Sequence, residues 1–312
     1  MAEDETKQRK LLEKIVKEIL KVTEIKNIKI LNEGYSNDVY EVKTEKGDFI
    51  LRIKPKNNKE TFEKTVNAMR FVENEIPNKI IKLSEDKKIM ITDKIEGNSL
   101  QSQLDNLTND EIFSILKKAF QSSIMMSNKK VVKGFGYLNE NLQGWANSAM
   151  EEVFFSLSEC LHSVVSKKYI DIEITKKIGN LFYNNIELFL NVEPRFVYCD
   201  LHFGNIIIEN KKFKSVIDFE SCYSGDPVRM FQSLFEIGYN TKYINIIIKA
   251  MSLNDKEKIK FRLYMILEIL NTLKIYCDEF LGKGIDSKRF NEKNMKYDKE
   301  LLIKLLNNNI KF

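Results

Sequence analysis

The sequence predicts an α+β fold with two parts, a small antiparallel β-sheet part with one long helix followed by a mainly helical part. Short segments rich in β-branched residues, separated by turn residues, occupy much of the first 94 positions. Apolar residues at helical spacing dominate the chain from residue 95 onward. A chain of 312 residues, 43% of them hydrophobic, can build a core in each part. We therefore predict a first domain over residues 1–94 and a second over residues 95–312.

The first domain is expected to begin with an amphipathic helix over residues 5–22, because Leu12, Val16 and Ile19 recur at helical spacing. Five short segments then predict strands, at residues 28–31, 39–42, 49–53, 80–83 and 89–91. Residues 45–48 form the expected turn between the second and third strands. The long helix of this domain is predicted over residues 60–72.

The second domain is expected to be mostly helical. Its first helices are predicted from apolar residues at helical spacing, namely Leu100, Leu104, Ile112, Ile115, Leu116 and Phe120. Further helices are predicted at residues 244–251, 261–280 and 299–307.

Three polar residues in the second domain follow or precede short predicted strands. Asp200 and Asn205 are five residues apart, and Asp218 follows the Asn by thirteen residues. Predicted strands at 196–198, 206–208 and 213–217 bracket them, so two tight loops would present all three groups together. Phosphoryl transfer requires a carboxylate that orients the attacking hydroxyl, an amide oxygen that binds Mg²⁺ and a second carboxylate for Mg²⁺. Ordinary turn residues are the alternative, but they would not explain the flanking strands.

The five-residue step from Asp to Asn matches the catalytic loop of protein kinases. Together with residues 216–220 and 225–227, the segment 199–208 resembles the aminoglycoside phosphotransferase family, and the likeness extends over about residues 28–235. This resemblance implies a two-lobed protein-kinase-like, choline-kinase-like fold. It also implies an enzyme that transfers the γ-phosphate of ATP or GTP to an alcohol group.

The same resemblance suggests a substrate class and roles for the three polar residues. The favoured substrate is an aminoglycoside-type antibiotic, and its phosphorylation would confer antibiotic resistance. A cationic substrate would suit the family. A metabolic kinase for choline, a sugar or an amino alcohol, and a nucleotide-binding pseudokinase, stay open as alternatives. Asp200 is expected to accept a hydrogen bond from the substrate hydroxyl, Asn205 to bind one Mg²⁺ ion and Asp218 to bind two.

Residues of the first domain are expected to bind the nucleotide. By resemblance, the loop 34–38 would cover the phosphates through Ser36 and Asn37. Backbone groups of Asp93 and Ile95, in the connection between the two domains, would bind the edge of the base.

The third predicted strand carries Arg52 and Lys54 on one face, and one of them should bind the α- and β-phosphates. The resemblance favours Arg52, whose guanidinium can bind phosphate through two hydrogen bonds, and Lys54 is the alternative. An acid from the following helix should pair with this cation. Glu60 and Glu63 are three residues apart on one face, and their spacing to Pro77 favours Glu63.

Two residues depart from the family pattern. Tyr198 stands two residues before Asp200, where His is usual, and Met230 stands where the family usually has another Asp. The hydrogen bond that the His makes within the catalytic loop must then be replaced or lost. These departures keep the pseudokinase alternative open.

Composition limits the other classes of function. Basic residues (50) nearly balance acidic residues (45), without a concentrated basic block, so we expect no nucleic-acid partner. The four cysteines lie far apart and suggest neither a zinc site nor a disulfide framework. The N-terminal residues are charged and no long apolar run occurs, so we expect a cytoplasmic protein without a membrane partner. We also expect a monomer.

Overall fold

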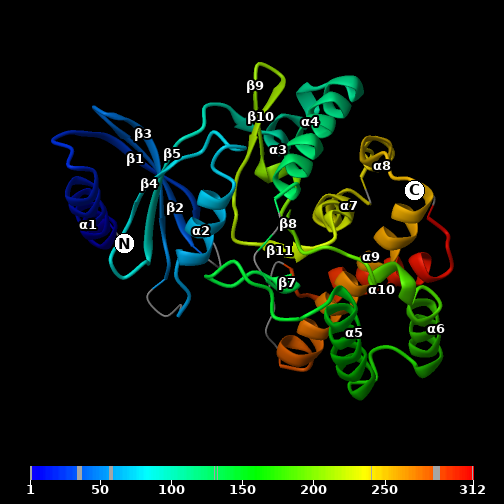
Figure 1. The fold of residues 1–312 in the computed structure, drawn as a ribbon. Helices are drawn as coiled ribbons and strands as arrows, with labels where there is room; N and C mark the ends of the chain where they lie inside the picture. Colours follow the sequence, from blue (N-terminus) through cyan, green and yellow to red (C-terminus); the bar gives the residue numbers. More distant parts are fainter. Residues whose placement is uncertain are drawn as a thin grey trace. The chain divides into compact units, whose positions relative to one another are not determined.

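The computed structural model describes residues 2–33, 37–55, 59–129, 131, 133–239, 241–283, 289–310 and 312. The chain divides into two compact units, each made of several segments. Unit 1 comprises the described residues of Met1–Leu107, Asn139–Leu142 and Phe203–Glu220. Unit 2 comprises those of Thr108–Leu138, Gln143–His202 and Ser221–Phe312. Figure 1 labels the elements of both units.

Unit 1 is built on a five-stranded antiparallel sheet in the order β1-β2-β3-β5-β4. Its strands and the helices of its N-terminal segment are α1 (Ala2–Leu20), β1 (Ile25–Glu33), β2 (Asp38–Thr44), β3 (Gly47–Ile53), α2 (Glu63–Phe71), β4 (Ile80–Leu83), β5 (Ile89–Asp93), α3 (Leu100–Gln103) and η1 (Leu104–Asn106). These elements confirm the predicted antiparallel sheet and its helices. The helix predicted over residues 60–72 begins at Glu63, three residues after the predicted start. Glu60 lies before the helix and contacts Lys54.

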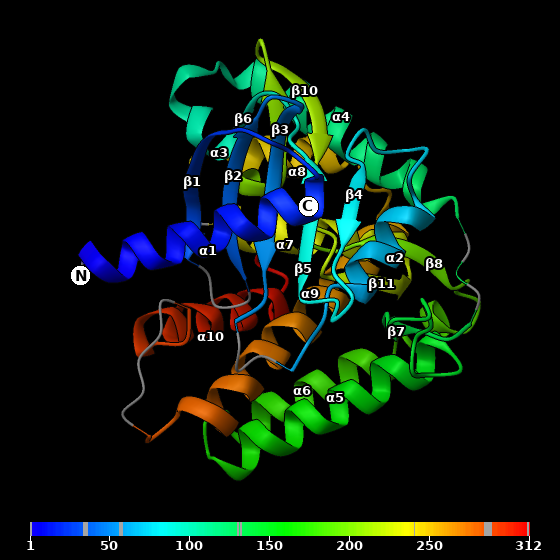
Figure 2. The same cartoon turned by 90° about the vertical axis from the view of Figure 1, so that its left-hand side faces the viewer.

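Helix α1 covers one face of this sheet, as Figure 2 shows. Its Leu12 and Val16 form a core cluster with Val42 of β2, Leu51 of β3 and Ile91 of β5. Side chains alternate between the two faces of a strand. The residues next to Leu51 on β3, among them Arg52, therefore belong to the face of the sheet opposite α1.

A second, three-stranded sheet in unit 1 brings a late segment of the chain to the early one. Its order is β10-β9-β6, with β6 (Asn98–Ser99), β9 (Ile206–Glu209) and β10 (Lys212–Val216), and η3 (Phe203–Asn205) precedes β9. Asn98 pairs with Ile208 and Ser99 with Ile207. Gly97, just before β6, has φ +125°, and a Cβ there would overlap the carbonyl oxygen of Ile208. Only glycine suits this backbone conformation and this close approach.

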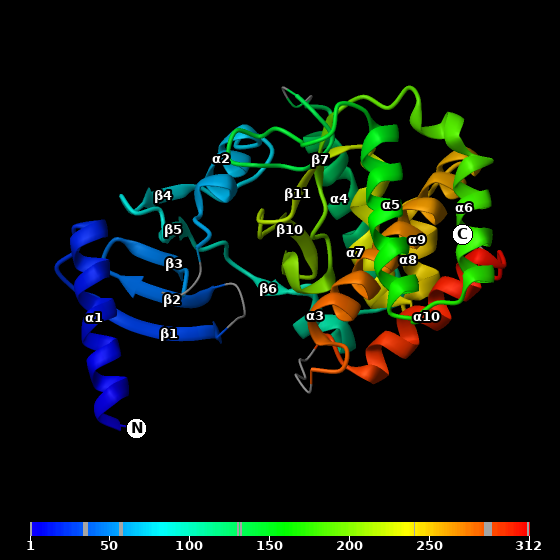
Figure 3. The same cartoon turned by 90° about the horizontal axis from the view of Figure 1, so that it is seen from below.

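Unit 2 is mainly helical, as predicted, and Figure 3 shows its helices packed alongside one another. They are α4 (Asn109–Ser127), α5 (Ala149–Ser166), α6 (Ile172–Tyr183), η2 (Ile186–Phe189), η4 (Pro227–Phe231), α7 (Gln232–Gly238), α8 (Ile244–Met251), α9 (Asp255–Ile275), a π-helical turn η5 (Tyr276–Phe280) and α10 (Glu292–Leu306). A small sheet in the order β7-β11-β8 completes the unit, with β7 (Gly136–Tyr137), β8 (Arg195–Tyr198) and β11 (Cys222–Gly225).

A buried charged residue, Arg229 of η4, joins several elements of unit 2. Its Nη1 atom lies 3.2 Å from Oε2 of Glu152 in α5 and donates a 2.7 Å hydrogen bond to the hydroxyl of Tyr223 in β11. Its Nε donates to Gln232 at 3.2 Å, and its guanidinium lies 4.0 Å from the centre of the Tyr223 ring. Interactions with these acidic and aromatic neighbours raise the pKa of Arg229, against the effect of burial. This network fixes the turn that follows β11.

Candidate functional site

A cavity of about 600 Å³ lies within unit 1, on the face of the sheet opposite α1. Strands β1, β2, β3 and β5 supply one side, and η3, β9 and Ile217, the residue after β10, supply another. The lining residues are Lys29, Leu31, Val39, Glu41, Ile50, Arg52, Asn78, Thr92, Asp93, Lys94, Ile95, Gly97, Asn98, Ser99, Ser102, Gly204, Ile207 and Ile217.

One end of the cavity is formed by the connection after β5. The N–H of Asp93 donates to the carbonyl of Lys79 at 3.0 Å, and the N–H of Lys94 donates to the carbonyl of Asp48 at 3.1 Å. Within the described part of the chain, the N–H of Ile95 has no such partner. A free backbone donor on a cavity wall can bind the edge of a planar heterocycle.

An ion pair lies on the same side of the cavity. Lys94 Nζ contacts Oε1 of Glu41 at 3.0 Å, and this hydrogen bond is the main reason that the pKa of Glu41 is lowered. Glu41 is therefore ionised near neutral pH, and its charge is balanced by that of Lys94.

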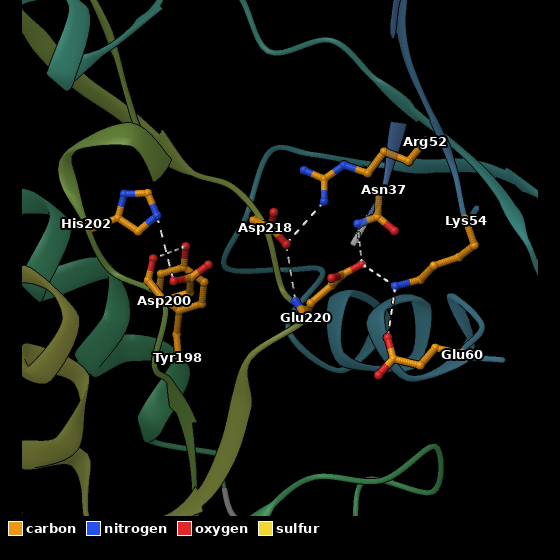
Figure 4. Close-up of polar contacts among 9 residues, drawn as sticks. All are labelled: Asn37, Arg52, Lys54, Glu60, Tyr198, Asp200, His202, Asp218 and Glu220. Atoms are coloured by element: carbon orange, nitrogen blue, oxygen red, sulfur yellow. Dashed lines mark hydrogen bonds and ion pairs between the residues drawn. The ribbon is translucent and has the colours of Figure 1, made fainter. Parts of the chain in front are cut away.

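Arg52, which lines the cavity, pairs with Asp218. The distance from its Nη1 to Oδ1 of Asp218 is 3.2 Å, and Figure 4 draws this contact. Asp218 has a left-handed backbone conformation, φ +68°, and its Oδ1 accepts a hydrogen bond from the N–H of Glu220 at 3.4 Å. A non-glycine residue in this region is uncommon and often marks a functional position.

A second ion pair joins Lys54, two residues after Arg52, to Glu220, two residues after Asp218. Lys54 Nζ lies 3.1 Å from Oε1 of Glu220 and 3.4 Å from Oε2 of Glu60. Lys54 does not line the cavity, and its side chain is only 2% exposed. Glu63 pairs with Lys87 at 2.6 Å, and neither Arg52 nor Lys54 contacts it. Of the two predicted acids, Glu60 is therefore the one that contacts a predicted cation, Lys54.

Asn205 is the last residue of η3, and a backbone hydrogen bond connects it to the residue before Asp218. Its carbonyl accepts a 3.0 Å hydrogen bond from the N–H of Ile217, the residue before Asp218. Asn205 is 8% exposed. Its side-chain amide oxygen and the Asp218 carboxylate are hard oxygen donors, which fit Mg²⁺. No group of three or more His, Cys, Asp or Glu side chains suited to a metal occurs among the described residues. Mg²⁺ sites with one or two protein ligands are usually completed by phosphate and water oxygens.

Asp200 belongs to unit 2 and follows β8. The hydroxyl of Tyr198 donates to the carbonyl of Asp200 at 3.2 Å, and Ser233 donates to the carbonyl of Cys199 at 2.7 Å. Nε2 of His202 lies 3.7 Å from Oδ1 of Asp200 (Figure 4). Burial raises the pKa of the Cys199 thiol to about 12, so this neighbour of Asp200 is neutral. Tyr198 thus makes a hydrogen bond within the loop, at the position where the family usually has His.

The structure places most of the predicted site residues. Unit 1 brings together Arg52, Asn205 and Asp218, and the cavity wall includes Asp93 and Ile95. Ser36 lies outside the described residues, whereas Asn37 is described and buried. Sequence reasoning missed Glu220 as the partner of Lys54. A signal was present, because Arg52 and Lys54 are two residues apart, as are Asp218 and Glu220.

The model of the phosphotransferase enzyme family matches residues 27–119 and 172–229. The chain belongs to the phosphotransferase enzyme family. It is a phosphotransferase of the small-molecule kinase class. The matched ranges contain the cavity residues of the sheet and all three polar residues of the predicted site. No curated protein matches the sequence.

Solved structures share the fold of this phosphotransferase at low sequence identity. A thermostable mutant of aminoglycoside phosphotransferase APH(4)-Ia, in ternary complex with AMP-PNP and hygromycin B, is 15% identical, with a TM-score of 0.72 and coverage of 94% of this chain and 98% of that one. ADP-bound aminoglycoside phosphotransferase APH(2'')-Ib is 13% identical, with a TM-score of 0.64 and coverage of 95% and 98%. A candidate fructosamine-3-kinase from Thermobifida fusca YX-ER1 is 10% identical, with a TM-score of 0.63 and coverage of 94% and 96%. The predicted kinase-like fold class is confirmed.

Within the described residues, no helix combines the length and the apolar character needed to cross a membrane.

Proposed function

We propose that this phosphotransferase transfers the γ-phosphate of a nucleoside triphosphate to a hydroxyl group of a small molecule in a Mg²⁺-dependent reaction. The observation that supports this most strongly is the cavity of unit 1. At one end lies the N–H of Ile95, which has no backbone acceptor among the residues that the structure describes, and Arg52, paired with Asp218, lies on the cavity wall. A base and a polyphosphate need these two kinds of partner.

The nucleotide base would bind at Asp93 and Ile95, with ATP as the expected donor and GTP as the alternative. Arg52 would bind the phosphates, because it lines the cavity, whereas the ammonium of Lys54 is buried against carboxylates. Its planar guanidinium can make two parallel hydrogen bonds to phosphate oxygens. We retain Ser36 and Asn37 as candidates for the loop that covers the phosphates.

Asn205 and Asp218 would hold Mg²⁺, since both supply hard oxygen donors and the Asn205 carbonyl is bonded to the N–H of the residue before Asp218. Bound Mg²⁺ would neutralise charge on the phosphate oxygens during transfer. When nucleotide and metal bind, Arg52 would exchange its contact with Asp218 for contacts with phosphate. Asp200 would accept a hydrogen bond from the substrate hydroxyl and orient it for in-line attack. The Tyr198 and Ser233 hydroxyls hold the backbone on which Asp200 lies.

An aminoglycoside-type antibiotic is the proposed substrate, and resistance of the host is the expected consequence. The support is the similarity of fold to structures of aminoglycoside phosphotransferases, one of them in complex with hygromycin B. A metabolic kinase for a sugar, choline or an amino alcohol is the alternative, and the similarity to a candidate fructosamine-3-kinase favours keeping it. We expect a cytoplasmic monomer without a nucleic-acid partner.

The test is nucleotide consumption by the purified protein, with ATP or GTP and Mg²⁺, across aminoglycosides, other antibiotics and metabolic alcohols. Asp200→Ala should abolish turnover and leave nucleotide binding intact. Asp218→Ala should weaken binding of the Mg-nucleotide as well. Asp255→Ala, at an exposed side chain of α9, is the matched control and should behave as wild type. Wild-type turnover by Asp200→Ala would overturn the role of this residue, and nucleotide binding without turnover on any compound would favour the pseudokinase.

A further inference from the structure

Glu220 connects three separate segments of unit 1. Its Oε1 accepts a 2.7 Å hydrogen bond from Nδ2 of Asn37 and lies 3.1 Å from Nζ of Lys54. Figure 4 shows the two side chains converging on this one carboxylate. Asn37 precedes β2, Lys54 follows β3, and Glu220 lies in the loop after β10. We call these three residues the Glu220 cluster.

The ammonium group of Lys54 depends on Glu220. Its side chain is 2% exposed and lies 5.0 Å from the centre of the Phe62 ring. A buried ammonium without a carboxylate partner is strongly destabilising. Its second partner, Glu60, is 72% exposed, whereas Glu220 is 22% exposed. Solvent screens the Glu60 contact more, so Glu220 supplies the greater part of the compensating charge.

Asn37 is held by the same carboxylate. The residue is only 7% exposed, and its Nδ2 donates to Glu220. A hydrogen bond to an ionised carboxylate is stronger than one between neutral groups. Glu220 therefore fixes the start of β2, where the phosphate-covering loop is expected to end.

The Glu220 cluster lies beside the pair formed by Arg52 and Asp218. Arg52 in β3 and Lys54 just after it are two residues apart, and Asp218 and Glu220 are two residues apart after β10. The two ion pairs connect the same two segments of chain. A shift of Glu220 away from Lys54 would therefore also move Asp218 relative to Arg52.

We propose that Glu220 is a positioning residue, which sets the separation of Asp218 from Arg52 and the placement of Asn37 through its bonds to Lys54 and Asn37. This inference rests on the proposed nucleotide site. It assigns Lys54 to the support of that site and leaves direct phosphate binding to Arg52. Affinity for the Mg-nucleotide should then depend on Glu220, although no role in contacting nucleotide is assigned to it.

The experiment compares Glu220→Gln, Lys54→Met and the double variant with wild type, and uses Glu60→Gln as the matched control. Gln keeps the shape of Glu220 and an oxygen that can accept from Asn37, but it removes the charge. The first measurement is the Kd of fluorescent N-methylanthraniloyl-ATP with Mg²⁺. The second is backbone hydrogen exchange of residues 37–44 and 47–53 without nucleotide. It measures directly how stably β2 and β3 are held in place.

We expect each single variant to weaken binding by about tenfold or more, because each leaves one charge of the pair uncompensated. The double variant, which has neither charge, should lose less than the product of the two single effects. Exchange at the start of β2 and the end of β3 should increase in Glu220→Gln, and Glu60→Gln should stay within about twofold of wild type in both measurements.

Wild-type affinity and wild-type exchange in Glu220→Gln would overturn the inference, as would independent effects in the double variant. A wild-type protein that binds no Mg-nucleotide would count against the proposed function. The exchange data would still decide the role of Glu220. Faster exchange in Glu220→Gln would support the proposal that Glu220 stabilises β2 and β3, and unchanged exchange would refute that proposal.

Discussion

Replacing Arg229 by Met should destabilise unit 2 more than most single substitutions. Arg229→Met keeps most of the apolar volume of the side chain but removes the cation that faces Glu152 at 3.2 Å. Both side chains are nearly inaccessible, with exposures of 5% and 7%. The hydroxyl of Tyr223 and the amide of Gln232 also lose their hydrogen bonds to the guanidinium.

The magnitude follows from the burial of the partner that is left behind. Breaking a buried ion pair by removing one partner costs about 3–5 kcal/mol, because the other charge stays uncompensated. For a unit of this size, each kcal/mol lowers Tm by roughly 2–4 °C, so we expect a fall of roughly 6–20 °C. The double variant Arg229→Met with Glu152→Gln removes both charges and should recover at least a third of the loss.

Differential scanning calorimetry at neutral pH measures these shifts. Lys176→Met is the matched control, because Lys176 pairs with Glu173 at 2.9 Å but both side chains are more than 60% exposed. It should change Tm by no more than about 2 °C. A fall of less than about 3 °C in Arg229→Met, or a double variant less stable than Arg229→Met, would refute the reasoning.

Three further predictions concern other described residues. Tyr198→Phe removes the hydrogen bond to the Asp200 carbonyl, worth about 1 kcal/mol, and should lower kcat roughly fivefold with unchanged nucleotide affinity; an unchanged kcat would refute it. Burial raises the pKa of Asp298 from 3.8 to about 6, so the stability that its neutral form provides is lost as pH rises through about 6. Asp298→Asn should remove about 3 kcal/mol of pH dependence between pH 3 and 7, and parallel Tm-versus-pH curves would contradict this. Gly97→Ala should lower Tm by several degrees and weaken nucleotide binding, whereas Gly179→Ala, on α6 with open space around it, should be neutral or stabilising by up to about 1 kcal/mol.

Much of the local structure could be predicted from the sequence because the signals are local. Alternation of apolar residues predicts β2 and β3, and helical spacing predicts α1, α4 and α9. Helix ends were less accurate where a side chain had a tertiary partner. Glu60, which was predicted inside a helix, instead contacts Lys54 outside it.

The family and the fold class were also readable in the sequence. The step from Asp200 to Asn205, with Asp218 after a strand, predicted phosphoryl transfer. The resemblance of residues 199–208, 216–220 and 225–227 to the aminoglycoside phosphotransferase family implied the family and the kinase-like fold, and both are confirmed. The roles of these three residues stay predictions. Substrate identity depends on surfaces built from distant segments, so no short motif specifies it.

The sequence by itself determined the element types, the family and the spacing of the polar residues, because these depend on near neighbours along the chain. Only the tertiary structure decided which charges meet. Both Arg52 and Lys54 had the right spacing for a phosphate ligand, and both Glu60 and Glu63 for its partner. Burial of Lys54 against Glu220, and the exposure of Arg52 to the cavity, separate the two cations. The physical reason is that ion pairing depends on distance and burial between segments, here more than 160 residues apart in sequence.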